Sequence, residues 1–259
     1  MPELPDLEVF SRNLSIKLKN KQVKEVLVGS TKKLNVSAEE LQKAIVGQKI
    51  VKIYRDGKEL YFEFENKTVL SMHMMLNGEL HLSKDEETPK YAILRMIFKG
   101  GNILTLTDFR GLAHATLNPE ADDTPDALSR IVDAHFFETT LASKKGAIKN
   151  ILLDQHVIRG IGNAYADEIL WEAGISPFSA ANKIPVPKLK SLAKAVRHVL
   201  DNAVKQISSS SPGLISGEMR DFLKIHHPKK THSPSGVPIL MKKTGARKTY
   251  YTDEQETYK

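Results

Sequence analysis

The feature that most constrains the fold is a change of hydrophobic periodicity near residue 118. Before that point, short segments alternate between apolar and polar residues, as Glu59–Phe64 does, and a period of two predicts half-buried strands. After it, apolar residues recur every three or four positions, as in Lys188–Ile207, which is typical of amphipathic helices. Strands followed by helices, rather than alternating with them, predict an α+β protein.

The first part of the chain is predicted to form one helix followed mainly by strands. Asp6–Leu18 has apolar residues at helical spacing, and Ser37 with Glu40 makes a capping box for a second helix that ends at Gly47. Asp56-Gly57 is a strong signal for a tight hairpin. The strand-like segments are Ile50–Tyr54, Glu59–Phe64, Val69–Met74, Glu79–Leu82, Ala92–Phe98 and Ile103–Thr107. They predict a β-sandwich or barrel.

The second part is predicted to be helical. Polar residues 118–125 read as a linker, and the clearest helices are Ile148–Gln155, Asn163–Ala173 and Lys188–Ile207. Ser216 is expected to cap a short helix that runs through Leu223. Near the end, Val237–Met241 and Lys248–Thr252 alternate in polarity and predict a β-hairpin.

The positive charge of the chain is concentrated near its C-terminus. The formal charge is +7 and the hydrophobic fraction is 41%, enough for a core. Residues 222–252 contain seven Lys and Arg but no Asp or Glu, which predicts a local phosphate-binding surface; a disordered basic tail is the alternative. Without cysteine, disulfides and thiolate zinc sites are excluded. No apolar run is long enough for a membrane span, so a cytoplasmic protein without membrane association is expected.

Pro2 is the first candidate for chemistry. If Met1 is removed, its nitrogen becomes a secondary amine with a pKa of roughly 7.7–8.0, partly neutral near pH 7. Such an amine can attack a sugar carbon and form an iminium ion, with Glu3 beside it as a proton donor. The plainer interpretation is an ordinary helix start with Pro2 and Pro5 ahead of the helix.

A second candidate is the turn between two predicted helices. Gly160 and Gly162 permit a tight turn, and Asn163 is expected to cap the helix that follows. Free amides at a helix N-terminus bind anions, so the turn is suited to a phosphate. The alternative is an ordinary tight turn between helices, which could carry the same residues.

Together, Pro2-Glu3-Leu4-Pro5, the Asp56-Gly57-Lys58 hairpin and the Gly160–Asn163 turn resemble the formamidopyrimidine-DNA glycosylase/endonuclease VIII family, in its expected order and over nearly the whole chain. The resemblance implies an N-terminal β-sandwich with an N-terminal helix, then a helix–two-turn–helix domain and a C-terminal hairpin finger. The implied domains are a catalytic domain over 1–117, a linker over 118–125, the helical domain over 126–224 and the finger over 225–259.

The resemblance also implies a function, a base-excision-repair DNA glycosylase that also cleaves abasic sites. Pro2 corresponds to the nucleophile that forms a Schiff base with deoxyribose, Glu3 to the catalytic acid, and Lys58 to an active-site lysine near the lesion. The implied partner is double-stranded DNA with damaged bases or abasic sites, and a monomer suffices. The implied strand cleavage proceeds by β-elimination, often followed by a second elimination.

The implied DNA-binding residues lie in four places. Leu76 matches a residue that fills the void left by an extruded base, whereas Arg110 faces the orphaned base and Leu112 acts as a wedge. For the two leucines, core packing is the alternative. The remaining contacts are to phosphate, from Asn163 with Gly160 and Gly162 and from Arg247 of the finger.

The chain departs from the family in three respects. Where many members bind zinc through four cysteines, the matching positions are His232, Ser235, Thr252 and Gln255, which predicts a zincless finger and no metal or cofactor. A metal held by the nearby histidines 226, 227 and 232 is the alternative. Asp6 stands where glutamate is usual. The segment 220–232 is short, which favours oxidised pyrimidines, ring-opened purines or hydantoins over 8-oxoguanine.

Two other functions compete with this interpretation. A protein of the same fold could bind abasic or distorted DNA without cutting it, and a retained Met1 would favour that function because it acylates the nitrogen of Pro2. A helix–two-turn–helix module of a ribosomal or topoisomerase protein would explain neither Pro2-Glu3 nor the β-rich first half.

Overall fold

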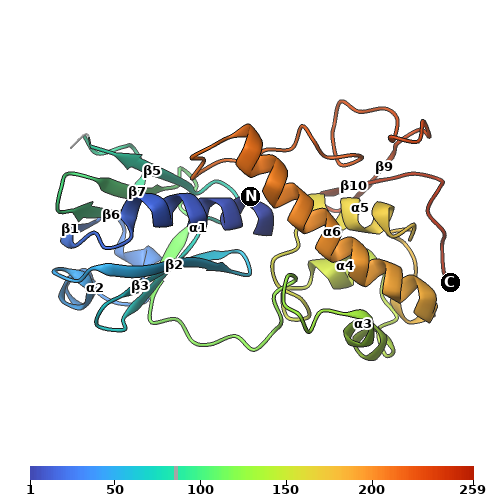
Figure 1. Ribbon diagram of the computed structural model, residues 1–259, viewed down its shortest axis with the longest axis horizontal. Helices are drawn as coiled ribbons and strands as arrows, with labels where there is room; N and C mark the ends of the chain where they lie inside the picture. Colours follow the sequence, from blue (N-terminus) through green and yellow to red (C-terminus); the bar gives the residue numbers. More distant parts are fainter. Residues whose placement is uncertain (85–86) are drawn as a thin grey trace. The chain divides into compact units, whose positions relative to one another are not determined.

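The computed structural model describes residues 1–84 and 87–259, and the chain forms two compact units (Figure 1). The N-terminal unit comprises Met1–Asp122 together with Ile207–Glu218, and the helical unit comprises Asp123–Gln206 together with Met219–Lys259. The predicted α+β class, with a β-rich first part, helices and a C-terminal hairpin, is confirmed. None of the described helices combines the length and apolar character needed to cross a membrane.

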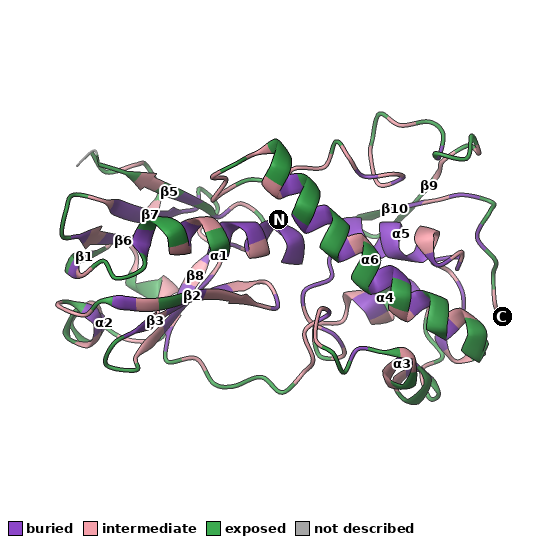
Figure 2. Ribbon diagram, in the orientation of Figure 1, coloured by how far each residue is buried: buried purple, intermediate pink, exposed green. Residues whose placement is uncertain are grey.

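Two four-stranded antiparallel sheets build the N-terminal unit, with strand orders β1-β6-β7-β5 and β2-β3-β4-β8. One hydrophobic cluster contains residues from both sheets, so they share a core (Figure 2). The strands are β1 (Val23–Val28), β2 (Ile50–Asp56), β3 (Glu59–Phe64), β4 (Val69–His73), β5 (Glu79–Ser83), β6 (Ala92–Phe98), β7 (Ile103–Thr107) and β8 (His114–Leu117). The predicted strands are therefore confirmed to within a few residues.

Helices α1 (Leu4–Leu18) and α2 (Ala38–Ile45) contribute to the same core, and a 3-10 turn, η1 (Thr31–Lys33), precedes α2. The apolar face of α1 that the spacing predicted is fully buried. Ser37 caps α2 as predicted, because its Oγ accepts from the Glu40 amide at 3.2 Å and its own amide donates to the Glu40 carboxylate at 2.8 Å.

The hairpin of β2 and β3 has the predicted tight turn. Asp56 pairs with Glu59, so Gly57 and Lys58 form a two-residue loop. Gly57 has a φ of 55°, in the left-handed region that only glycine enters without strain. This turn fixes the position of Lys58 at the end of a regular strand pair.

The helical unit contains the three predicted helices and one that was not predicted. Its elements are α3 (Ala134–Leu141), α4 (Ile148–Leu153), α5 (Asn163–Glu172), the 3-10 turn η2 (Ala181–Lys183), α6 (Val186–Ser210), β9 (Leu240–Thr244) and β10 (Arg247–Tyr251). The unpredicted α3 begins at Asp133, whose carboxylate accepts from the Phe136 amide at 2.9 Å. Aspartate is a preferred N-cap residue, so Asp133 could have indicated the start of this helix from the sequence.

Two local predictions were wrong. Residues 216–223 form no helix, because Gly217 has a φ of 86° and the Ser216 hydroxyl accepts from the Leu80 amide at 3.0 Å instead of capping a turn. Strand β9 begins at Leu240 rather than Val237. Val237 closes a turn in which the Ser233 amide donates to its carbonyl at 2.8 Å, with Gly236 at a φ of 85°.

Candidate active site and nucleic-acid interface

The chain start is held rigidly at the first turn of α1. Pro2 is buried, Glu3 is 5% exposed, and the Glu3 amide donates to the carboxylate of Asp6 at 2.9 Å. Asp6 is completely buried, and its carboxylate reaches the Glu3 amide although the side chain is one methylene shorter than that of glutamate. The Pro2-Glu3 pair is thus positioned by burial and by the hydrogen bond between the Glu3 amide and the Asp6 carboxylate.

The segment that follows α6 packs against this chain start. The side chain of Asn13 donates to the Leu214 carbonyl at 2.7 Å, the Leu80 amide donates to Ser216, and the ammonium of Met1 pairs with Glu218. These contacts are spread over α1, β5 and the first residue. Residues 214–218 consequently border the place where Pro2 lies.

Lys58 is linked to α1 through the strand that leads to it. Arg55 of β2 forms an ion pair with Glu8 of α1 at 3.1 Å, and the Arg55 side chain is 6% exposed. Because Arg55 is three residues before Lys58 and Glu8 is five residues after Glu3, this partly buried pair joins the two predicted catalytic segments within one unit.

His73 is a candidate site residue that was not predicted from the sequence. It pairs with Glu59, the neighbour of Lys58, and stacks on His114 with ring centroids 5.4 Å apart. Burial, then His114 and Lys58, lower the pKa of His73 to about 4, so the ring is neutral at pH 7. Its Nδ1 accepts from the Met75 amide at 2.9 Å, which leaves the proton on Nε2 as a donor.

Leu76 and Leu112 are both exposed, by 53% and 40%, which excludes the core-packing alternative. Their loops leave adjoining strands, because His73 at the end of β4 pairs with His114 at the start of β8. Arg110 is exposed beside Phe109, an aromatic side chain that is itself 60% exposed. The loop that carries Leu76 and the loop that carries Arg110 and Leu112 therefore emerge from the same edge of one sheet.

Asp108 organises the second of these loops and was not predicted to do so. Its carboxylate is buried and accepts from the amides of Arg110, Leu112 and Ala113 at 2.7–2.8 Å. Burial alone would raise the pKa of Asp108, but these backbone donors, together with that of Gly111, hold it below its ordinary value. An ionised Asp108 thus fixes the backbone under Arg110 and Leu112.

Gly78 marks the contact between the two loops, and replacing it by alanine is expected to disturb both. A Cβ there would lie 2.3 Å from the Met74 carbonyl oxygen and 2.8 Å from the Ala113 methyl. We expect a loss of about 1–3 kcal/mol in the free energy of unfolding and weaker binding of lesion-containing DNA. Thermal unfolding and a binding titration measure the two effects.

Gly146→Ala is the matched control, because its new methyl would meet only Ile151 at an ordinary 3.8 Å. Equal behaviour of the Gly78 and Gly146 variants would contradict a tight contact between the loops.

In the helical unit, the turn between α4 and α5 has the glycine geometry that was predicted, but its cap differs. Gly160 has a φ of 101°, and its amide donates to the Gln155 side chain at 3.0 Å. The N-cap of α5 is Gly162, not Asn163, which is the first helical residue. The Asn163 side chain instead donates to the Lys248 carbonyl at 3.0 Å and so joins the turn to β10.

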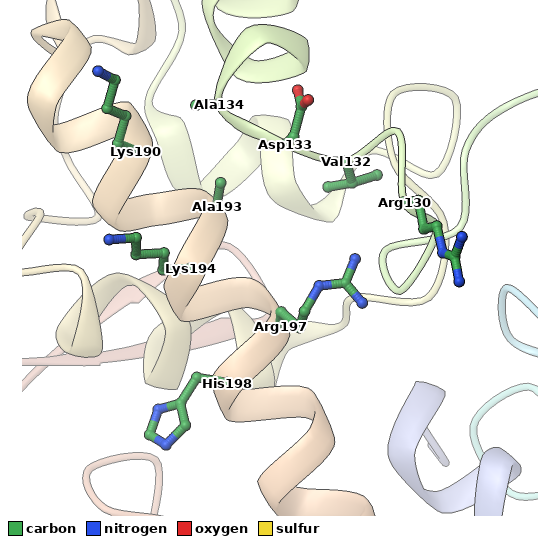
Figure 3. A pocket seen from close by; sticks show the side chains of 9 residues that line it. All are labelled: Arg130, Val132, Asp133, Ala134, Lys190, Ala193, Lys194, Arg197 and His198. Carbon is green, nitrogen blue, oxygen red and sulfur yellow. The ribbon is translucent and has the colours of Figure 1, made fainter.

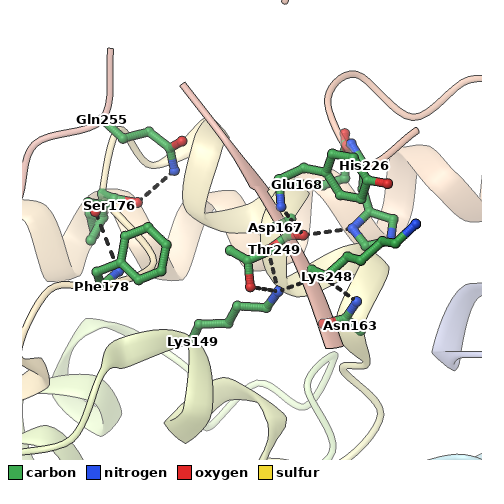
Figure 4. A network of polar contacts seen from close by, with 12 residues as sticks. Lys149, Asn163, Asp167, Glu168, Ser176, Phe178, His226, Lys248, Thr249 and Gln255 are labelled. Carbon is green, nitrogen blue, oxygen red and sulfur yellow. Dashed lines mark hydrogen bonds and ion pairs between the residues drawn. The ribbon is translucent and has the colours of Figure 1, made fainter. Parts of the chain in front are cut away.

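A buried charge network attaches β10 to α4 and α5 (Figure 4). Asp167 of α5 pairs with Lys149 of α4 at 2.7 Å and with His226 at 2.7 Å, and it accepts from the Tyr250 amide at 2.9 Å. Lys149 also donates to the hydroxyl of Thr249 at 2.8 Å. Because the hairpin is fixed to the α4–α5 turn in this way, its exposed cations have a defined position relative to Asn163.

Arg247 is exposed at the first position of β10, directly after the Gly245-Ala246 turn of the hairpin. Neighbouring Lys242, Lys243 and Lys248 are exposed as well. The predicted hairpin is thereby confirmed as an ordered element that presents four cations, and a disordered basic tail is excluded.

The finger is held together around the carboxylate of Glu254. That carboxylate accepts from Ser233 at 3.1 Å, from Thr252 at 3.0 Å, from Trp171 at 3.2 Å and from Ser235. The hydrogen bond from Ser235 holds the pKa of Glu254 below its ordinary value. Since a lowered carboxyl pKa stabilises the fold above the unfolded pKa, this contribution is present at neutral pH and is lost as the pH falls through the folded pKa.

The donors present do not fit the zinc that many family members hold here. Gln255 uses its side chain to accept from the Thr252 amide at 2.9 Å and to donate to the Ile175 carbonyl at 2.8 Å. Across residues 1–84 and 87–259, no group of three or more His, Cys, Asp or Glu side chains is arranged to hold a metal ion. The alternative site is likewise not assembled, because His226 contacts Asp167 whereas His232 contacts Thr231.

The chain is similar to known DNA glycosylases over most of its length. The model of the formamidopyrimidine-DNA glycosylase N-terminal domain matches residues 1–115, and that of the formamidopyrimidine-DNA glycosylase H2TH domain matches residues 124–212. A formamidopyrimidine-DNA glycosylase of Listeria monocytogenes is 30% identical over 97% of this chain and 98% of its own. One from Lactobacillus gasseri is 33% identical over 80% of this chain and 78% of its own.

Two solved structures of Lactococcus lactis Fpg are similar over almost the whole chain. The complex with DNA containing an abasic site has a TM-score of 0.86 at 25% identity and covers 97% of this chain and 98% of that one. The complex with DNA containing an oxidised pyrimidine has a TM-score of 0.85 at 27% identity, with the same coverage.

Proposed function

Because the chain belongs to the formamidopyrimidine-DNA glycosylase family, we propose that it is a DNA glycosylase of base excision repair that also cleaves the strand at abasic sites. The proposed substrate is double-stranded DNA with a damaged base or an abasic site. The observation that carries the proposal is the rigid, buried Pro2-Glu3 pair at the start of α1.

The proposed reaction begins once Met1 has been removed. The neutral nitrogen of Pro2 attacks C1′ of the damaged nucleotide, the bond from C1′ to the base breaks, and the base leaves with the proton that the nitrogen gives up. Glu3 protonates the ring oxygen, so the sugar ring opens and a C1′ iminium remains on Pro2. Loss of a proton from C2′ then expels the 3′ phosphate by β-elimination, and water finally hydrolyses the iminium and frees Pro2.

The extruded base leaves a void that the two loops at the sheet edge are proposed to fill. Leu76 and Leu112 are exposed apolar side chains suited to wedging between bases, and Arg110 supplies donors for the orphaned base. Lys58 and the Nε2 donor of neutral His73 lie together beside these loops and are proposed to hold the phosphates next to the lesion.

Phosphate contacts from the helical unit are proposed to hold the DNA backbone in a bent form. The turn of Gly160, Gly162 and Asn163 offers backbone amides at the start of α5, and Arg247 offers a guanidinium on the hairpin. The short segment 220–232 supports oxidised pyrimidines, ring-opened purines or hydantoins as the preferred lesions. The L. lactis complex with an oxidised pyrimidine is in keeping with that choice.

Covalent trapping tests the proposed function directly. Duplexes that each contain one defined lesion are incubated with the protein and sodium borohydride, and a reduced protein–DNA complex is expected on abasic and oxidised-pyrimidine duplexes. A form with one additional N-terminal residue, which acylates the nitrogen of Pro2, should bind these duplexes but trap none. Equal trapping by the extended form would show that Pro2 is not the nucleophile. If the native form binds these duplexes but forms no trapped complex, the protein binds DNA without catalysing the reaction.

Arg247→Ala is expected to weaken binding to all DNA sequences alike, because the guanidinium is proposed to contact phosphate and not bases. The slope of log K against log salt concentration should fall by about 1. Titrations at several salt concentrations measure that slope, and Lys24→Ala, which removes an exposed cation on β1, serves as the control. An unchanged slope in the Arg247 variant would show that Arg247 does not contact the phosphate backbone.

A further inference from the structure

A groove of about 640 Å³ lies between α6 and the segment that enters α3, within the helical unit (Figure 3). Ala193 of α6 and Ala134 of α3 each place only a methyl group on its walls, and Val132 is a third, buried lining residue. Short side chains at these positions explain why the two elements leave space between them. A volume of this size is typical of ligand pockets, which measure about 300–1,000 Å³.

The segment on the far side of the groove is fixed in place. Arg197 of α6 donates to the carbonyls of Leu128 and Ser129 at 3.4 and 3.1 Å. Asp133 at the end of the segment caps α3. The groove is therefore a preformed feature of the unit.

The rim of the groove is strongly basic. Arg130, Lys190, Lys194 and Arg197 all line it and all are exposed. Among the described residues that line the groove, Asp133 is the single carboxylate, and it is engaged by the Phe136 amide. An anionic occupant is thus favoured by the charge of the site.

The groove also favours an apolar anchor, which distinguishes a peptide from a phosphate backbone. Ile131 lies between two lining residues and is 61% exposed, and alanine and valine side chains form the walls. Apolar walls gain little from phosphodiester groups but bury a leucine or phenylalanine side chain.

From this combination we propose that the groove between α3 and α6 binds a short acidic segment of a partner protein, anchored by one or two large apolar side chains. Carboxylates of the segment pair with Lys190, Lys194 and Arg130, and the apolar side chain enters between Ala134 and Ala193. This binding is separate from the proposed glycosylase chemistry and does not depend on it.

Fluorescence anisotropy with the labelled peptide Asp-Glu-Asp-Leu-Phe-Glu-Asp-Glu tests the proposal on the full chain. Saturable binding with a Kd on the order of 10–100 µM is expected. Lys190→Glu combined with Lys194→Glu should weaken it at least about 10-fold. Lys24→Glu combined with Lys205→Glu, the same total change of charge at exposed positions that do not line the groove, should alter it less than about 2-fold. Absence of saturable binding, or equal losses in both variants, would overturn the proposal.

Two further arms separate the peptide from other occupants. A peptide with serines in place of Leu-Phe should bind at least about 10-fold more weakly, and equal affinity would refute the apolar anchor. The double variant of Lys190 and Lys194 should bind an abasic duplex as the unaltered protein does. If the double variant also loses affinity for DNA, the groove is a nucleic-acid surface and the proposal is overturned. If the unaltered protein forms no borohydride-trapped complex, only the proposed glycosylase function is affected.

Discussion

Replacement of Pro2 by glycine is expected to abolish or strongly weaken borohydride trapping and to slow base excision at least about 100-fold, equivalent to about 2.7 kcal/mol of barrier. A secondary amine gives an iminium that is positively charged without needing a further proton, whereas the primary amine of glycine gives an imine that must be protonated before elimination. Glycine also removes the buried ring that holds the nitrogen beside Glu3. Single-turnover excision and gel quantification of trapped complex measure the two effects.

The matched control is Pro5→Ala, which removes the other proline at the start of α1 but leaves the terminal nitrogen unchanged. It should retain trapping, and both variants should bind a duplex with a stable abasic analogue. Trapping at the unaltered level by the Pro2 variant would show that another amine, of which Lys58 is the first candidate, forms the Schiff base.

Lys149→Met is expected to destabilise the protein by about 3–5 kcal/mol, because Asp167 stays buried and loses its ion pair with the Lys149 ammonium. The Asp167 side chain is completely buried and that of Lys149 is 6% exposed, so water cannot replace the lost partner. We also expect weaker DNA binding, since the network fixes β10 and Arg247 to the α4–α5 turn. Denaturant unfolding and a binding titration measure these changes.

Adding Asp167→Asn to Lys149→Met removes the orphaned charge while an amide oxygen can still accept from Tyr250. This double variant should recover part of the lost stability. If single and double variants unfold at the same denaturant concentration, the charge on Asp167 does not account for the effect.

Elements that depend on local pattern were predicted well from the sequence. The alternation of Leu60, Phe62 and Phe64 and the capping box of Ser37 involve residues close along the chain, and both are as predicted. The short helix expected after Ser216 failed because a distant partner, Leu80, takes its hydroxyl. Tertiary contacts of this kind leave no trace in local periodicity.

The same distinction applies to the candidate site. The motifs containing Pro2, Glu3 and Lys58 are contiguous and could be recognised, although their roles remain proposals. His73 and Asp108 were not predicted, because their importance lies in their neighbours. These are the stacked ring of His114 for His73 and the loop amides for Asp108. The Glu254 centre draws on residues as far apart as Trp171 and Ser233, and no spacing rule predicts it.

The Glu254 centre has a consequence for the conditions under which this protein can work. Oxidants that damage DNA bases also attack the sulfur atoms of zinc fingers, and the metal is then released. A finger closed by the carboxylate of Glu254 and three hydroxyls uses no sulfur atom at that point, and the whole chain lacks cysteine. The contacts that hold the hairpin of Arg247 should therefore survive both oxidising conditions and a shortage of zinc, and exposed Met241 of β9 is left as the sulfur atom that peroxide can reach in the hairpin.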